Sequence, residues 1–185
     1  MLTLALALVA ALQATPRQDP SQTAGDLQAM YDEITETTLS ATSAEDFDNF
    51  HAVFFTSDWT FTDRQGVHHT WSELHDAAIH DWLNQPADSM RDVIRRADLR
   101  DASAVTDVSS IVIRVVVDAD GKYGARGASH RIAESTPMRD HWVLGETGWK
   151  VQAREQMGET KLFVDKLPPE MENPKGPIAK QLTRR

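Results

Sequence analysis

An aspartate in the segment RDHWVLGETGWKVQARE, residues 139–155, offers the clearest chemistry in the sequence. The segment alternates as two strands around a tight turn, and Asp140 shares a strand face with apolar residues, among them Trp142. If that face lines a cavity, burial favours the protonated carboxyl, which donates a hydrogen bond. The alternative is a carboxylate that pairs with Arg114 or Arg131 on a neighbouring strand, or one that faces solvent.

Two further residues carry groups that exchange protons. Asp63 ends the expected strand DWTFTD, where it could act as a general base if it reaches a substrate proton. The alternative is that it caps the RQG turn that follows, a common role for aspartate. Tyr31 could place its hydroxyl in the same cavity or could be an ordinary core aromatic on an amphipathic helix. The candidate catalytic residues are therefore Asp63, Asp140 and Tyr31.

Several large side chains could form the wall of such a cavity. An apolar cavity with a few polar groups suits a hydrophobic or aromatic small molecule. The candidate ligand-binding residues are Tyr31, Trp59, Phe61, Arg114 and Trp142.

Four histidines lie close together at His68, His69, His75 and His80. His75 and His80 are five residues apart, whereas helices that bind zinc place their ligands three or four apart. We therefore predict no metal site. The sequence has no glycine-rich phosphate loop and no Gly-x-Ser-x-Gly motif, and we expect no cofactor.

The composition narrows the class of protein. The chain has 185 residues, enough for one domain with a sizeable core. Its formal net charge of -9 argues against nucleic acid as a partner, because phosphate binding needs a basic surface. The absence of cysteine excludes disulfides and thiolate chemistry.

Both ends of the chain differ in composition from the middle. Residues 1–14 hold an apolar run typical of a cleaved export signal, too short to span a bilayer comfortably, so we expect an exported protein, periplasmic or extracellular, with no stable membrane insertion after cleavage. Residues 15–25 are polar, contain proline and glycine, and predict a linker. The folded domain is expected over residues 26–158, and residues 159–185 predict a polar, flexible tail.

The apolar spacing predicts helices first and strands later. Helical spacing covers residues 27–39, 43–55 and 70–83, the last two with a Ser43 or Thr70 cap at their start. One short strand at residues 58–63 lies between the second and third helices. Four strands then follow in a meander, at residues 91–101, 105–117, 129–144 and 149–156. This order predicts an α+β fold with three helices packed on a curved antiparallel sheet.

The chain resembles the nuclear transport factor 2-like (NTF2-like) superfamily, within it the ketosteroid isomerase, SnoaL-like and DUF4440-type domains. The resemblance covers roughly residues 26–158 and rests on FFTSDWTFTDRQG, TWSELHDAAI and RDHWVLGETGWKVQAREQ. It implies a cone-shaped fold, commonly a homodimer through its sheet. By resemblance to the isomerases, Asp63 would be the base and Asp140 an oxyanion-hole acid. Their tyrosine would fall at Leu39 without a gap, about two helical turns after Tyr31.

Three functional hypotheses follow. The first is an exported SnoaL-like domain with a pocket for a hydrophobic small molecule and no assigned activity. The second is a cofactor-independent isomerase, dehydratase or hydrolase that uses Asp63 and Asp140 as acid and base. The third is a non-catalytic dimerisation or interaction domain, which a filled core without a cavity would favour.

Overall fold

The computed structural model describes residues 20–172, with side chains from residue 25. The expected export signal at 1–14 and residues 173–185 of the expected tail lie outside the described residues. Helix α1 (Pro20–Ser40) begins inside the stretch predicted to be a linker. Proline suits the first position of a helix, because that position needs no amide hydrogen and favours the proline backbone angle. No helix among residues 20–172 is long and apolar enough to cross a membrane.

The expected order of helices and strands is confirmed. Three N-terminal helices precede a four-strand meander, whereas the short strands β2 and β7 and the short helix α4 were not predicted. After α1 the elements are α2 (Ala44–Phe54), β1 (Phe55–Thr62), β2 (His68–Thr70), α3 (Trp71–Asn84), β3 (Ser89–Arg100), β4 (Ser103–Val117), β5 (Ser129–Gly145), β6 (Gly148–Gln156), β7 (Lys161–Val164) and α4 (Pro169–Glu172).

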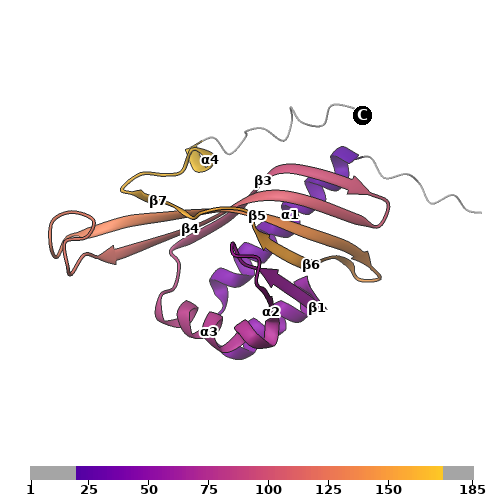
Figure 1. Ribbon diagram of the computed structural model, residues 1–185, viewed down its shortest axis with the longest axis horizontal. Coiled ribbons are helices and arrows are strands. Elements are labelled where there is room, and N and C mark those ends of the chain that lie inside the picture. The colour runs from indigo at the N-terminus through magenta and orange to yellow at the C-terminus, as the bar shows by residue number, and fades with distance from the viewer. Residues whose placement is uncertain (1–19, 173–185) are drawn as a thin grey trace, which may run out of the picture.

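All strands join one curved, unclosed sheet with the order β2-β1-β6-β5-β4-β3. Figure 1 shows α2 and α3 below the long β4–β5 hairpin, α4 above it, and α1 behind the strands. The sheet is antiparallel, as expected, except that β1 pairs with β6 in parallel. Helix α3 and strands β3 to β5 separate these two strands in sequence, so β6 returns beside β1 in the same direction.

Local capping fixes where α2 and α3 begin. The Ser43 hydroxyl accepts from the Asp46 amide, and the Asp46 carboxylate accepts from the Ser43 amide at 2.9 Å. At α3 the Thr70 amide donates to the Glu73 carboxylate at 2.7 Å. These contacts satisfy amide groups that have no partner within the helix, and they confirm both starts expected from the sequence.

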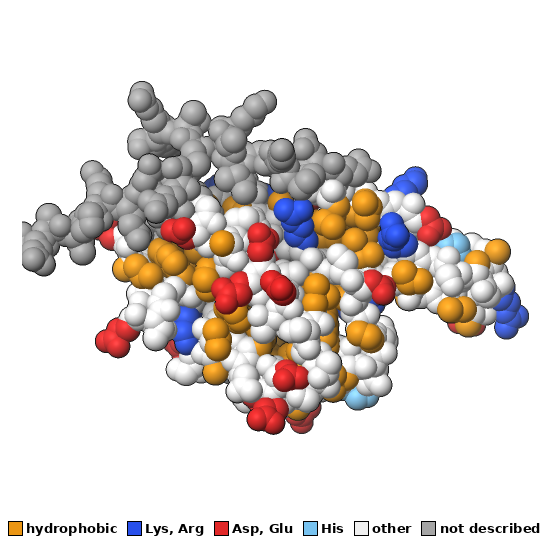
Figure 2. All heavy atoms as spheres, turned by 180° about the vertical axis from the view of Figure 1, so that it is seen from behind, with side chains coloured by type: hydrophobic (Ala, Val, Ile, Leu, Met, Phe, Trp, Pro, Cys, Tyr) orange, Lys and Arg blue, Asp and Glu red, His pale blue; other side chains and the backbone are white. Residues whose placement is uncertain are grey.

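The main core lies between α1 and the inward face of the sheet. Helix α1 contributes Leu27, Tyr31 and Ile34, all at most 5% exposed. Opposite them lie buried sheet residues, which are Trp59, Ile94, Ala104, Val108, Trp142, Trp149 and Val151. Figure 2 shows acidic side chains scattered over one face of the molecule, with lysine and arginine in small separate groups.

The first part of the expected tail is folded. Strand β7 pairs with β5 from Ile132 to Ser135, beyond the end of β6. Phe163, Leu167 and Met171 pack on a buried apolar cluster of the outer sheet face, formed by Ile111, Ile113 and Ala133. The prediction of a flexible tail is therefore wrong for residues 161–172, because these scattered apolar residues cover part of the sheet.

Candidate functional site

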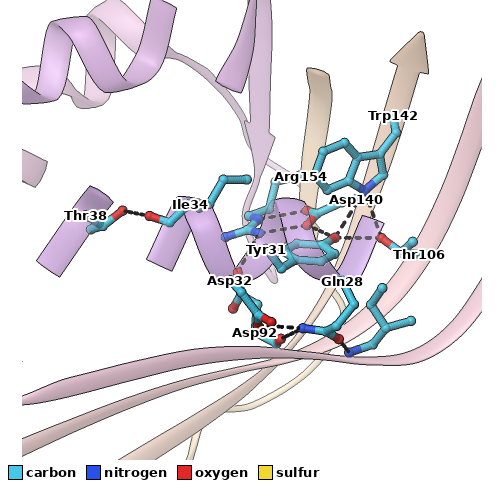
Figure 3. A network of polar contacts seen from close by, with 11 residues as sticks. Gln28, Tyr31, Asp32, Ile34, Thr38, Asp92, Thr106, Asp140, Trp142 and Arg154 are labelled. Atoms are coloured by element: carbon cyan, nitrogen blue, oxygen red, sulfur yellow. Dashed lines mark hydrogen bonds and ion pairs between the residues drawn. The ribbon is translucent and has the colours of Figure 1, made fainter. Parts of the chain in front are cut away.

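The polar side chains beneath α1 form one connected network (Figure 3). The Tyr31 hydroxyl donates to Asp140 Oδ2 at 2.5 Å and lies 2.6 Å from Thr106 Oγ1. The Trp142 indole N–H donates to Thr106 Oγ1 at 3.0 Å and to the Tyr31 oxygen at 3.2 Å. Since the phenol proton goes to Asp140, the Thr106 hydroxyl is the donor to Tyr31. These four side chains are at most 1% exposed, so they fill the space between α1 and the sheet.

Arg154 supplies the positive charge of this network. Its Nε and Nη2 donate to Asp140 Oδ1 and Oδ2, both at 2.7 Å, and Nη2 also donates to Asp92 Oδ2 at 3.2 Å. Burial by itself lowers the pKa of Arg154, but the carboxylates of Asp140 and Asp92 outweigh it and raise that pKa well above its ordinary range. The second Asp92 oxygen, Oδ1, is buried without a hydrogen-bond partner.

The ion pair corrects the expectation for Asp140. We expected a carboxyl that donates a hydrogen bond in a cavity, a carboxylate paired with Arg114 or Arg131, or one that faces solvent. Asp140 instead accepts at both oxygens from Arg154, which lies directly opposite it on β6. A bidentate contact of this kind is typical of an ionised carboxylate.

Tyr31 takes part in the network as a donor to Asp140. Burial and the nearby Asp140 charge raise the pKa of Tyr31 well above the usual value of 10.0. Its hydroxyl is enclosed and fully used within the protein, so it does not face a substrate in this arrangement.

Asp63 lies at the β1–β2 turn, outside the buried network. Its Oδ1 accepts from the Gln65 amide at 2.8 Å and from the Val67 amide at 2.9 Å, and its Oδ2 lies 3.5 Å from His69 Nε2. The Val67 hydrogen bond, with smaller contributions from His69 and Gln65, lowers the pKa of Asp63. These contacts match the turn-capping role that the sequence left open as the alternative.

Two residues expected in the wall of the predicted cavity, Arg114 and Phe61, lie in different parts of the structure. Arg114 Nε donates to the Gln85 carbonyl at 2.8 Å and Nη1 to Glu134 at 3.2 Å, so Arg114 joins the β4–β5 hairpin to the end of α3. Phe61 packs against the main core. The structure therefore brings Tyr31, Asp140 and Trp142 together and leaves Asp63 and Arg114 apart from them.

Trp59 belongs to a different feature, which we call the aromatic cleft. This cleft has a volume of about 930 Å³ and lies between the end of α2, β1, the start of α3 and β6. Its aromatic wall consists of His51, Phe55, Trp59 and Trp71, and its polar lining includes Thr70, Ser72, Asp58 and Lys150.

The rings of the aromatic cleft are ordered by stacking. The His51 imidazole is stacked between Trp71, with ring centroids 4.5 Å apart, and Phe55, at 5.1 Å. Trp59 presents its ring edge-on to these rings, at 5.4 Å from Phe55 and 6.2 Å from Trp71. Burial lowers the pKa of His51 to about 4, so the ring is neutral at pH 7.

Two polar atoms in this wall have no hydrogen-bond partner. They are the indole nitrogen of Trp59 and Nε2 of His51, both buried. An unpaired buried polar group costs about 1–3 kcal/mol. A hydrogen bond from a bound molecule to either of these atoms would therefore be stabilising.

Four residues of these two features were not predicted from the sequence: Arg154, His51, Trp71 and Lys150. For Arg154 a signal existed, because β6 alternation puts it on the same face as Val151 once one extra residue is allowed. His51 and Phe55 are four residues apart and would share one face of the helix expected over residues 43–55, although Phe55 begins β1 in the structure. Trp71 and Lys150 gave no comparable signal. Within residues 25–172, no group of three or more His, Asp or Glu side chains is arranged to hold a metal ion.

No protein-family profile matches the sequence, and no curated protein matches it. Solved structures of similar shape include a conserved protein from Planctomyces limnophilus, 12% identical, with a TM-score of 0.53 over 76% of this chain and 99% of that one. A Mycobacterium tuberculosis protein of unknown function is 15% identical, with a TM-score of 0.51 over 86% and 82%. An NTF2-like protein from Cytophaga hutchinsonii is 14% identical, with a TM-score of 0.43 over 75% and 97%.

The order of elements and the order of strands identify the class of fold. Three helices packed on a curved, unclosed mixed sheet form an α+β cone, the fold that the resemblance in the sequence had predicted. The chain therefore has an NTF2-like α+β cone fold. This fold carries many unrelated functions, so the function has to be argued from the sites on it.

Proposed function

We propose that the protein binds a planar, largely apolar small molecule in the aromatic cleft. The observation that carries this proposal is the row of stacked rings at Phe55, His51 and Trp71, which borders the cleft beside the unpaired Trp59 N–H. Aromatic walls with a few polar groups are typical of small-molecule sites.

The polar part of the lining fits a ligand that has one hydrogen-bonding end. Thr70 and Ser72 supply hydroxyls, and Lys150 Nζ, which donates to the Ala52 carbonyl at 2.8 Å, supplies a positive charge. Because His51 is neutral, the stacked rings favour contact with an uncharged aromatic ligand over contact with a cation. The ligand class is therefore an aromatic or polycyclic compound with a polar substituent.

Binding without catalysis suits the arrangement better than acid–base chemistry. An isomerase, dehydratase or hydrolase that uses Asp63 and Asp140 needs both carboxyl groups at one substrate. Asp63 is engaged by its own turn, and Asp140 is enclosed with Arg154. Neither residue lines the aromatic cleft.

Fluorescence titration with N-phenyl-1-naphthylamine, a neutral planar probe, tests the proposal. We expect saturable binding, about fivefold weaker in Trp71→Ala, because a lost aromatic contact is worth roughly 1 kcal/mol. Trp71→Phe, which keeps a ring, should bind nearly as wild type.

Trp82→Ala is the matched control for this titration. Trp82 is on the same helix but packs against Phe47, with centroids 6.1 Å apart, and it does not line the cleft. Absence of saturable binding, or equal loss in Trp71→Ala and Trp82→Ala with both variants folded by circular dichroism, would refute the proposal.

A second candidate function, self-association through the outer sheet face, is favoured by a row of charges. Arg96, Asp107, Arg139 and Glu155 lie side by side on β3, β4, β5 and β6 and alternate in sign. A two-fold rotation about the middle of this row brings each cation opposite an anion of a second copy. Sedimentation equilibrium at 50 and 500 mM NaCl should show a homodimer that weakens with salt and with Glu155→Lys, but not with Asp32→Lys on α1. A monomer at low salt and high protein concentration would exclude this candidate.

We also propose that the chain is exported, on the basis of the apolar run at residues 1–14. The mass of the protein secreted or released from the periplasm of its host should correspond to cleavage near residue 14. A protein that keeps Met1 and remains inside the cell would contradict export.

A further inference from the structure

His75 on α3 lies between two carboxylates on different helices. Its Nδ1 is 2.7 Å from Asp76 Oδ1 on the same helix, and its Nε2 is 3.0 Å from Asp48 Oδ1 on α2. A neutral imidazole has one N–H, whereas both contacts require a donor from the ring. The two hydrogen bonds therefore form together only when His75 is protonated.

The same side chain contacts the wall of the aromatic cleft. The His75 ring meets Trp71 edge-on, with centroids 5.4 Å apart, and Trp71 is in turn stacked on His51 of α2. Three contacts join α2 and α3 in succession along the helices: Trp71–His51, His75–Asp48 and Trp82–Phe47. The first belongs to the cleft wall, and the His75–Asp48 contact comes directly after it.

We propose that His75 is a positioning residue that holds α2 and α3 in the ligand-binding geometry when protonated and loosens the cleft when neutral. This inference rests on the proposed ligand binding in the aromatic cleft. It adds a pH dependence to that binding, with tighter binding in mildly acidic conditions.

The charges around His75 give the direction of the effect. Among the described residues, the titratable groups that face it are Asp76 on its own helix and Asp48 and His51 on α2. The hydrogen bond with Asp76, and then that with Asp48, raises the pKa of His75 above 6.5. The pKa of His51 is near 4, so His51 stays neutral from pH 5 to 8 while His75 changes charge. The α2–α3 contact is therefore complete below about pH 6.5 and is lost as the pH rises through the raised value.

The test is the affinity for N-phenyl-1-naphthylamine between pH 5.5 and 8.5. We expect about threefold tighter binding by wild type at the acidic end, because exposed ion pairs contribute only weakly. His75→Gln and Asp48→Asn should each flatten this profile. His80→Gln is the matched control, because His80 is on the same helix and its side chain is mostly exposed beside Asp81.

The outcomes separate this inference from the function on which it rests. The role of His75 is overturned by saturable binding with a flat wild-type pH profile, or by a pH dependence that persists in His75→Gln. Either result still supports the ligand site. Absence of binding at every pH overturns both.

Discussion

Asp140 and Arg154 lie directly opposite each other on strands β5 and β6, and the guanidinium group binds both carboxylate oxygens at 2.7 Å. Asp92 contacts the same guanidinium, so two carboxylates share one cation inside the cone. With Tyr31, Thr106 and Trp142 around them, these groups occupy the interior where the sequence had suggested a substrate cavity. The interior polar residues therefore act in stability, and the exposed aromatic cleft becomes the candidate site.

Replacement of Arg154 should strongly destabilise the fold. Arg154→Met leaves the buried Asp140 carboxylate without its cation, and breaking a buried pair in this way costs about 3–5 kcal/mol. Urea denaturation followed by circular dichroism measures the loss. Arg114→Met, which breaks a partly exposed pair with Glu134, should cost less than about 1 kcal/mol. Similar losses in the two variants would contradict the central role of Arg154.

Tyr31 should resist ionisation in the folded protein. The chain has two tyrosines, so in Tyr123→Phe the phenolate absorbance at 295 nm reports Tyr31 alone. Its raised pKa means that no phenolate signal appears near pH 10 while the protein stays folded. Because the folded value lies above the unfolded one, this group stabilises the fold fully below pH 10 and loses that contribution as the pH rises further. A spectrophotometric titration with a midpoint near 10 in folded protein would rule out the enclosed hydroxyl.

Asp63 should behave as a turn cap. Asp63→Asn keeps an oxygen that accepts from the Gln65 and Val67 amides, so it should melt close to wild type, whereas Asp63→Ala should melt at a lower temperature. The lowered pKa of Asp63 means that its contribution is present above the unfolded value and is lost as the pH falls through the folded one. Thermal melts of both variants at pH 7 and pH 3 check this. If Asp63→Ala melts like wild type at pH 7, the capping role is excluded.

The segment from β7 to α4 should contribute measurable stability. Phe163→Ala removes part of the cover over Ile111, Ile113 and Ala133 and should cost about 1–2 kcal/mol. Leu162→Ala is the neighbouring control, since Leu162 is 52% exposed and its loss should cost less than about 0.5 kcal/mol. Chemical denaturation distinguishes this pattern from that of a flexible tail, in which both variants would match wild type.

The order of elements and the helix starts were predictable because they depend on neighbouring residues. Ser43 and Asp46 cap α2 with groups three positions apart, and the apolar residues of α1 recur at helical spacing. Strand alternation likewise placed Asp140 on the same face of β5 as Trp142, and in the structure both are buried. The flexible tail was mispredicted because its apolar residues, Phe163, Leu167 and Met171, are too widely spaced to form a pattern.

The residues themselves determined an α+β chain with an acid on the apolar face of a strand, since periodicity, capping and charge are local properties of the sequence. Only the tertiary structure decided that β1 lies parallel to β6 and that Arg154, rather than Arg114 or Arg131, neutralises Asp140. It also decided that His51 is stacked on Trp71, which is twenty residues away. The register of distant strands and the packing of two helices set these contacts, and neither leaves a periodic signal in the sequence.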